Sequence, residues 1–205
     1  MTSSTTARRD GEATRQRLLR AALELYTTVG FRATTTPAIA ARASVAEGTI
    51  YRHFSGKEHL LNEVFRNAQQ WGVALVREDE GGRPAAPERL QQIARRLLEA
   101  AAHDPAQTRM LLRRRDEQHL DEGSREAEHQ FHDALQQIVA GGKSEGLLRP
   151  GPAELWTDVW LALVAFAAER VGAGLWSPDS PSVVMTLDAA WDAITARDAT
   201  ATAGR

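Results

Sequence analysis

The sequence predicts an all-α fold. Apolar residues recur at the three- and four-residue spacing of helices along most of the 205 residues, and no run of alternating apolar and polar residues indicates a strand. The chain is 42% hydrophobic and 25% charged, which is typical of a globular protein that can bury one or two cores. We expect two domains, residues 1–66 and 67–205, with residues 1–11 disordered.

The chain begins with two predicted helices. The first covers residues 12–29, where apolar side chains form one broad stripe, and Gly30 follows where a glycine commonly ends a helix. Thr34–Thr36 then offer hydroxyl caps, and Pro37 suits a first helical turn. A short second helix is therefore expected over residues 39–43.

A tight turn at residues 44–45 leads to a third predicted helix, residues 47–54. After it, Ser55 and Glu58 have the spacing of a capping box, which predicts the start of a long fourth helix that continues to about Arg77. Two short helices joined by a tight turn indicate a helix-turn-helix motif. Such a motif lays its second helix in the major groove of DNA.

The polar face of the third helix has side chains suited to DNA. Gly48 lets the backbone approach closely, and Arg52 can bond a guanine with two hydrogen bonds. Lys57 begins the fourth helix, where free N–H groups and the helix dipole favour a phosphate. Thr35 can donate to a phosphate while it caps the second helix. These contacts predict a DNA-binding domain.

Charge is divided unequally along the chain. Residues 1–66 hold ten Lys and Arg against six Asp and Glu, a net +4, whereas residues 67–205 hold fifteen against twenty-one, a net −6. A basic first third on an acidic body favours a polyanionic partner for the first third, although an imbalance of this size can also reflect solvated faces.

The segment "GFRATTTPAIAARASVAEGTIYRHFSGKEHLLNEVF" resembles the N-terminal domain of the tetracycline-repressor (TetR) family. The resemblance covers about residues 12–66, and the spacing of its motif agrees without a gap. It implies phosphate contacts from Thr35, Tyr51, His53 and Lys57, and base or groove contacts from Gly48, Thr49 and Arg52. The predicted DNA-binding residues are Thr35, Thr36, Gly48, Thr49, Tyr51, Arg52, His53 and Lys57.

Two positions depart from the family pattern. Ser44 stands where the family usually has the turn glycine, and Ala46 stands where it usually has a serine or threonine that caps the third helix. A missing N-cap costs about 1 kcal/mol. We therefore expect the start of the third helix to fray or to become ordered on DNA.

The remaining chain predicts a helical body. A Gly- and Pro-rich loop at residues 78–88 separates it from the fourth helix. Further helices are expected at residues 90–101, 110–112, 124–145, 153–171 and 184–194.

This body is predicted to bind a ligand and to dimerise. Residues 153–171 are apolar on more than one side, so other parts of the protein must pack against this helix from two directions. The last helix has a single apolar stripe, formed by Val184, Leu187, Trp191 and Ile194. The resemblance implies that these last two helices pair with the same helices of a second chain, so we expect a homodimer through residues 153–195 with Trp191 in the interface. We place an apolar or amphipathic effector near Met110, Phe131, Trp156 and Trp160, although aromatic residues at helical spacing are more often core.

Other functions are less well supported. No catalytic triad order, paired-carboxylate site or Gly-rich cofactor loop has a suitable context, so we expect no catalytic residues and no cofactor. His129 and His132 could face a metal ion, but a solvated acidic helix explains them better, and cysteine is absent. The apolar stretch at residues 159–168 is half the length of a membrane-spanning helix, and no signal peptide is evident.

The predicted function is a cytoplasmic transcriptional repressor that binds an inverted-repeat operator in double-stranded DNA and is released by a small hydrophobic or amphipathic ligand. The alternatives are a DNA-binding protein without a ligand and an all-α enzyme.

Overall fold

The computed structural model describes residues 3–78, 84–112 and 117–196, and it confirms the all-α fold. Within these ranges the chain forms α-helices and two short 3-10 helices. They are α1 Ser3–Thr28, α2 Thr36–Arg42, η1 Glu47–Thr49, α3 Ile50–His53, α4 Lys57–Arg77, α5 Ala86–His103, α6 Pro105–Leu112, η2 Glu117–His119, α7 Glu122–Ser144, α8 Ala153–Gly172 and α9 Pro181–Ile194.

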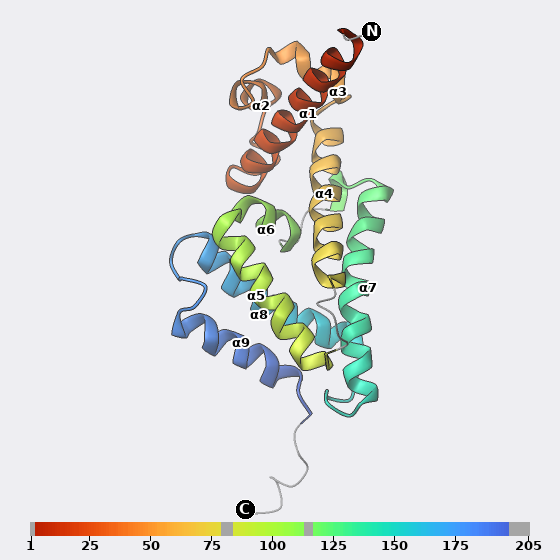
Figure 1. Ribbon diagram of the computed structural model, residues 1–205, viewed down its shortest axis with the longest axis vertical. Coiled ribbons are helices and arrows are strands. Elements are labelled where there is room, and N and C mark those ends of the chain that lie inside the picture. The colour runs from red at the N-terminus through yellow and green to blue at the C-terminus, as the bar shows by residue number, and fades with distance from the viewer. Residues whose placement is uncertain (1–2, 79–83, 113–116, 197–205) are drawn as a thin grey trace, which may run out of the picture.

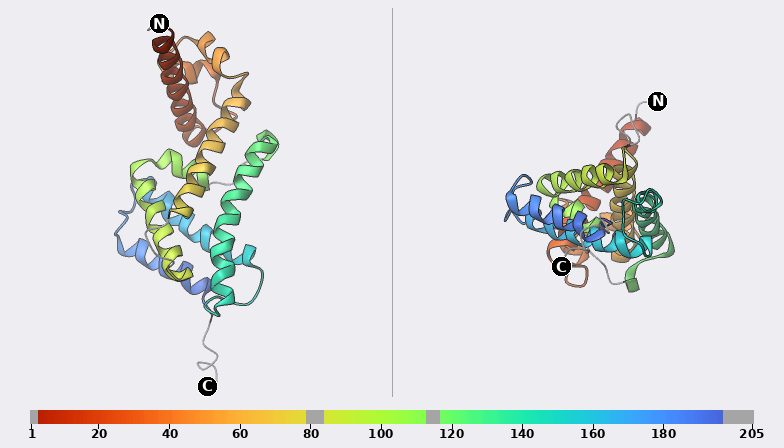
Figure 2. Two further views of the ribbon diagram at one scale, coloured as in Figure 1. Left: turned by 45° about the vertical axis from the view of Figure 1, so that its right-hand side comes forward. Right: turned by 90° about the horizontal axis from the view of Figure 1, so that it is seen from below.

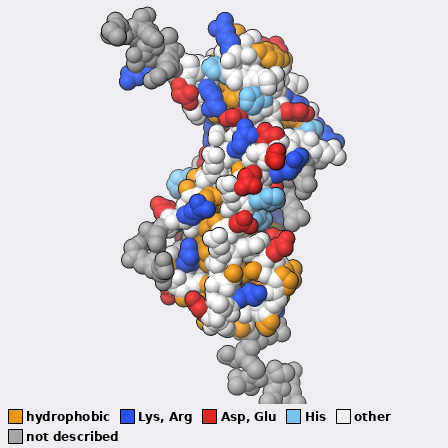
Figure 3. All heavy atoms as spheres, turned by 90° about the vertical axis from the view of Figure 1, so that its right-hand side faces the viewer, with side chains coloured by type: hydrophobic (Ala, Val, Ile, Leu, Met, Phe, Trp, Pro, Cys, Tyr) orange, Lys and Arg blue, Asp and Glu red, His pale blue; other side chains and the backbone are white. Residues whose placement is uncertain are grey.

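The helices form an elongated molecule with a small N-terminal head on a larger body (Figure 1). Helices α1, α2 and α3 make the head, and α4 runs from the head into the body, where α7 lies beside it (Figure 2). Helices α5, α8 and α9 complete the body. On the face drawn in Figure 3, charged side chains of both signs are interspersed, and hydrophobic side chains gather near the lower end. That face therefore shows no single-sign charged patch.

The N-terminus differs from the prediction, because α1 begins at Ser3 and includes most of the segment expected to be disordered. Ala7, Arg8 and Arg9 are good helix formers, and adding residues to an existing helix costs far less than starting one. The predicted end of this helix is confirmed, since Gly30 follows it with a φ of +95°.

The turn of the helix-turn-helix carries the two departures from the family pattern. Ser44 has a φ of +57°, a left-handed conformation that costs a residue with a side chain about 1 kcal/mol relative to glycine. Ala46 makes no capping hydrogen bond, and the chain enters the recognition helix through η1 before α3 begins at Ile50. The first turn is thus tighter than the α-helix predicted over residues 47–54.

The predicted capping box before α4 is wrong. Gly56 occupies the cap position and makes no side-chain cap bond, while His59 reaches back to accept a hydrogen bond from the Ser55 amide at 3.1 Å. The imidazole nitrogen of His59 thus accepts the hydrogen bond that the capping box assigns to the carboxylate of Glu58. The predicted end of α4 at Arg77 is confirmed.

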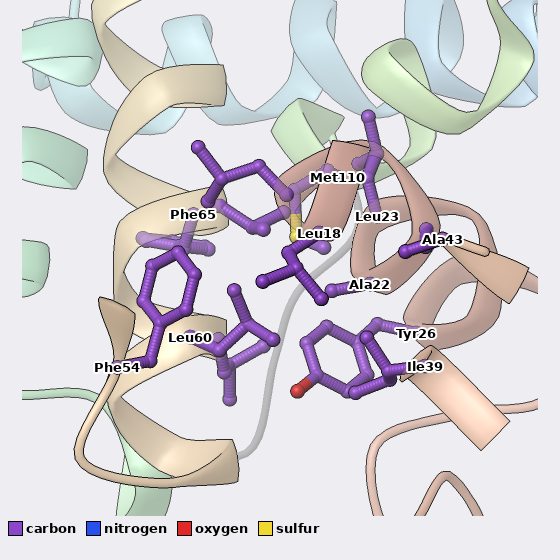
Figure 4. Packing of buried hydrophobic residues seen from close by; sticks show 14 of the residues in the cluster. Leu18, Ala22, Leu23, Tyr26, Ile39, Ala43, Phe54, Leu60, Phe65 and Met110 are labelled. Atoms are coloured by element: carbon purple, nitrogen blue, oxygen red, sulfur yellow. The ribbon is translucent and has the colours of Figure 1, made fainter. Parts of the chain in front are cut away.

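The head has its own core, which extends into the body (Figure 4). Leu18 of α1, Ile39 of α2 and Leu60 of α4 are fully buried in this first core. Met110 of α6 and Leu120, which follows η2, complete it from the body side. The head is therefore packed on the body rather than tethered to it.

A second core fills the body between α4, α5, α7, α8 and α9. Leu75 and Val76, near the end of α4, belong to this second core. Gly72 makes the close packing possible, because a Cβ built on it would lie 2.6 Å from Leu111 and 2.9 Å from Phe131. Both cores thus include parts of α4.

The last two helices expose an apolar face. Val184 and Ile194 were predicted on one stripe, but Val184 is 51% exposed and Ile194 is fully buried. Ten residues of helix separate them, so their directions differ by about 80°. Trp191 is half-buried and packs against the second core, so only part of its surface is left for a partner. The exposed apolar residues of this face are Leu155, Ala162, Phe166, Val184, Met185 and Ala189.

Among the described residues, none of the helices has the length and apolar character needed to cross a bilayer.

Ion pairs between helices predict a loss of stability in acid. Burial alone raises the pKa of Glu63, but hydrogen bonds and attraction from Arg66 and Arg15 lower it overall. The pKa values of Glu24 and Asp121 are lowered in the same way by their arginine partners. Because the folded pKa lies below the unfolded one, this stabilisation is complete above the unfolded pKa and is lost as pH falls through the folded pKa.

We therefore expect the urea-derived free energy of unfolding to fall between about pH 5 and about pH 3. The Glu63→Gln variant should show a smaller fall over the same range, because one of the three carboxylates no longer titrates. A wild-type free energy that stays constant over this range would contradict the assignment.

Candidate nucleic-acid interface

The recognition helix presents a polar face to solvent. Ile50 and Phe54 are buried in the first core and fix the orientation of α3. Tyr51 is 57% exposed, and Arg52 beside it is also exposed. A Cβ built on Gly48 meets no atom within 4 Å, so the surface at the start of this helix is open. This is the arrangement that a helix needs to enter a DNA groove.

The residues around α2 divide into exposed and engaged groups. Thr35 is exposed and caps α2, because its hydroxyl accepts a hydrogen bond from the Ala38 amide at 3.3 Å. Thr36 is half-buried, and its hydroxyl lies 3.5 Å from a carboxylate oxygen of Glu47. Thr35 therefore stands at the free N-terminus of α2, where backbone N–H groups favour a phosphate.

Glu47 was missed by the sequence analysis. It is the first residue of η1 and is exposed at the entrance to the recognition helix. A carboxylate at such a position can accept a hydrogen bond from the amino group of cytosine. The sequence does place Glu47 directly before Gly48, at the start of the predicted recognition helix, and that position could have indicated a base contact.

Lys57 is less available than its sequence suggested. Its ammonium donates to the carbonyl oxygens of Phe31 and Thr34, each at 3.0 Å, and lies 4.3 Å from the centre of the Phe31 ring. Two of its three N–H donors are thus used inside the head. Lys57 holds the loop before Thr35, and only one donor remains for a phosphate.

The other predicted DNA contacts are less exposed than Tyr51 and Arg52. Thr49 and His53 are half-buried, and the His53 ring lies 6.3 Å from the ring of Phe54. Tyr26 fixes the start of α4, since its hydroxyl donates to the Lys57 carbonyl at 3.0 Å. Burial raises the pKa of Tyr26, so the hydroxyl keeps its proton for this bond.

Three of the four predicted effector residues belong to the second core or pack against it, and the fourth belongs to the first core. Met110 belongs to the first core, whereas Phe131 and Trp160 belong to the second. Trp156 is half-buried at the surface of the second core, where its indole nitrogen donates to the Pro150 carbonyl at 3.1 Å. The first three are well-packed core residues, which is the alternative that the sequence analysis left open for the aromatic side chains.

The buried side chain of Gln69 in α4 is not fully hydrogen-bonded. Gln69 is 1% exposed, and its Nε2 makes only a long hydrogen bond of 3.5 Å to the Leu111 carbonyl. Its Oε1 is buried with no hydrogen-bond partner. An unsatisfied buried amide oxygen costs about 1 to 3 kcal/mol. The sequence signal for it was a glutamine among the apolar positions of α4.

Described residues line open pockets along the body. One of about 440 Å³ is bounded by α6 and α8, with Ala162, Ala165 and Phe166 on its apolar side. An ion pair between Arg109 and Glu169 at 3.1 Å lies at this pocket. Within the described part of the chain, acidic and histidine side chains form no group able to hold a metal ion. His132 lies 3.7 Å from Asp158 of α8.

Residues 18–64 match the family model for bacterial regulatory proteins of the tetR family. The transcriptional repressor KstR2 of Mycobacterium tuberculosis is 34% identical over 93 residues, which are 45% of this chain and 46% of the relative. The transcriptional repressor KstR of Rhodococcus jostii is 34% identical over 99 residues, 48% of this chain and 46% of the relative. The matched segment thus spans about half the length of these curated relatives.

The fold agrees over most of the chain with solved structures of lower identity. A TetR family transcription regulator from Marinobacter aquaeolei is 20% identical with a TM-score of 0.76, covering 93% of this chain and 100% of that one. The fatty acid degradation regulator FadR of Bacillus halodurans is 18% identical with a TM-score of 0.71, covering 87% and 94%. Residues 18–64 thus carry the likeness to the tetR family of bacterial regulatory proteins, and the solved structures show that the whole described chain shares their fold.

Proposed function

We propose that the protein is a DNA-binding transcriptional repressor whose operator binding is relieved by a small hydrophobic or amphipathic ligand. The observation that carries the DNA-binding part is the orientation of α3. Ile50 and Phe54 anchor it in the first core while Gly48, Tyr51 and Arg52 face solvent. The curated relatives named above are repressors, which supports repression over activation.

The contacts divide into those that position the protein and those that read bases. Thr35 at the start of α2 and the remaining donor of Lys57 are suited to phosphates, which position the head without reading sequence. Arg52 is suited to guanine, and Glu47 is suited to cytosine. A single head of this size reads few base pairs, so the proposal requires two heads on an inverted repeat.

The exposed apolar face of α8 and α9 supports a homodimer through residues 153–195. Leu155 is 48%, Phe166 46% and Met185 72% exposed, so two adjacent helices carry large exposed apolar side chains. Faces of this kind on a soluble domain usually bind another protein surface. A two-fold axis through this face would present two heads to one side of a DNA duplex.

The ligand part of the proposal rests on α4. This helix begins beside the DNA-binding loop at Lys57, packs in the second core through Leu75 and Val76, and ends at the exposed Arg77. A ligand that shifts α4 within the second core would therefore also move the head. The buried Gln69 supports a ligand with a hydrogen-bond donor, because such a donor would satisfy its free Oε1. Typical coupling free energies of about 1 to 3 kcal/mol would be enough to relieve repression.

Two alternatives remain in other classes. A DNA-binding protein without an effector would share the head but not the coupling, and an all-α enzyme would need catalytic groups in one of the open pockets. The relatives are regulators and not enzymes, which disfavours the second alternative. A repressor of bacterial type would act in the cytoplasm, where its operator lies.

Replacement of Arg52 by Ala should relax base preference. If Arg52 makes a two-bond contact with guanine, we expect a loss of about 1 to 3 kcal/mol on the preferred operator and little loss on other sequences. The measurement is fluorescence anisotropy with duplexes selected by the wild type from a random-sequence library. Arg77→Ala, at the far end of α4, is the matched control, and equal losses on every sequence would contradict base reading by Arg52.

Replacement of Met185 by Asp should break the dimer. Met185 is largely exposed in a single chain, so an aspartate there is compatible with folding, but in a dimer it would bury an unpaired charge. Analytical ultracentrifugation at low micromolar concentration should show folded monomer. Gln130→Asp, on the exposed side of α7, should remain dimeric. A dimeric Met185→Asp variant would place the interface elsewhere.

Ligand sensing should appear as a joint change in tryptophan fluorescence and operator affinity. Long-chain fatty acids are a reasoned first panel, because one structural neighbour is a fatty acid degradation regulator, and the matching fatty alcohols add the hydrogen-bond donor that Gln69 requires. A compound that binds should weaken operator affinity by about 5- to 150-fold, and Gln69→Leu should reduce the affinity for compounds that carry a donor. A compound that binds tightly and leaves operator affinity unchanged would favour the ligand-independent alternative.

A further inference from the structure

Side chains from α4 and from η2 contact the loop between α1 and α2. On one side the Lys57 ammonium donates to the Phe31 and Thr34 carbonyls, as described above. On the other side the ring of His119 packs on the ring of Phe31, with centres 4.5 Å apart and planes tilted by 48°. Phe31 thus contacts both Lys57 and His119, and the ring of Tyr26 lies 5.5 Å from its own. Thr35 follows Phe31 by only four residues.

His119 comes from the body and not from the head. It is the last residue of η2, and the next residue, Leu120, is buried in the first core. The buried Asn62 fixes this segment, since its Nδ2 donates to the His119 carbonyl at 2.9 Å and its Oδ1 accepts from the Asp121 amide at 2.8 Å. The position of the His119 ring is therefore set by α4 and by the start of α7.

The start of α7 is itself fixed to α4. Asp121 caps α7 by accepting from the Ser124 amide at 2.8 Å, and its carboxylate accepts from Arg66 at 2.8 and 2.9 Å. An unbroken series of contacts thus leads from the first turn of α7 through Asn62 and His119 to Phe31.

We propose that His119 is a positioning residue for DNA binding: its ring packs on Phe31, which also contacts Lys57, and so fixes the loop that carries Thr35. This inference rests on the proposed DNA-binding function. The contact of the His119 ring with Phe31 carries the proposed positioning role. The Nδ1 of His119 also lies 3.3 Å from the Glu58 carboxylate, but the proposal does not depend on this ion pair. The side chain is 25% exposed, so its replacement removes a contact at the surface of the head–body junction and not a part of either core.

The proposed role gives the body a second route to the DNA-binding surface, in addition to the movement of α4. If η2 moves away from the head, Phe31 loses the contact with His119 and keeps those with Lys57 and Tyr26, so the loop that carries Thr35 becomes freer. Because the loop contacts phosphates, the result is weaker binding to every DNA sequence, with base preference unchanged.

The test compares three variants of the full-length protein: His119→Ala, His119→Phe and the control His129→Ala, which changes an exposed histidine on α7. Anisotropy is measured on the selected duplex and on a duplex of unrelated sequence. We expect His119→Ala to bind both about 3- to 10-fold more weakly, as the loss of one aromatic contact implies. His119→Phe keeps a ring on Phe31 and should restore wild-type affinity. His129→Ala should bind as the wild type does.

Hydrogen exchange without DNA supplies a readout that is independent of the proposed function. In His119→Ala, exchange should accelerate at the amides of residues 31–38 and stay unchanged in α8 and α9. Accelerated exchange with no DNA binding by the wild type would leave the positioning contact intact and refute the proposed function. Wild-type affinity in His119→Ala, failure of His119→Phe to restore binding, or unchanged exchange at residues 31–38 would each overturn the role of His119.

Discussion

One continuous helix, α4, is buried in two cores, and the rest of the structure depends on this constraint. Its 21 residues extend for about 30 Å. Leu60, Leu61 and Phe65 pack in the head, and Leu75 and Val76 pack in the body. A rigid rod shared by two close-packed interiors cannot move in one without repacking in the other. The head therefore has no independent orientation, and the direction in which α3 points is a property of the whole chain.

The sequence predicted the helical elements well where local chemistry determines them. Gly30, Thr35 and Pro37 mark helix ends through backbone geometry and side-chain caps, which act over three or four residues. Ser55 and Glu58 have the spacing of a capping box, but the Ser55 amide donates to His59 instead of Glu58, so that prediction was wrong. A local pattern lists possible partners, and only packing decides which of them is in reach.

The site was predicted in part for the same reason. The exposed face of α3 follows from helical periodicity, so Tyr51 and Arg52 were found, whereas the two carbonyls that hold Lys57 come from a loop 23 and 26 residues earlier. The contact of His119 with Phe31 joins residues far apart in sequence, and no short motif announces it. The body was harder still, because an aromatic residue in a core and one that lines a ligand cavity have the same helical spacing.

The central claim is that the exposed face of α3 enters the major groove of two inverted half-sites. Methylation protection of the selected operator tests it most directly, because dimethyl sulfate modifies guanine N7 in the major groove and adenine N3 in the minor groove. The account predicts protected guanines in two half-sites with centres about 34 to 36 Å, or one DNA turn, apart or a multiple of that distance. Protection confined to adenine N3, or to a single half-site, would contradict it.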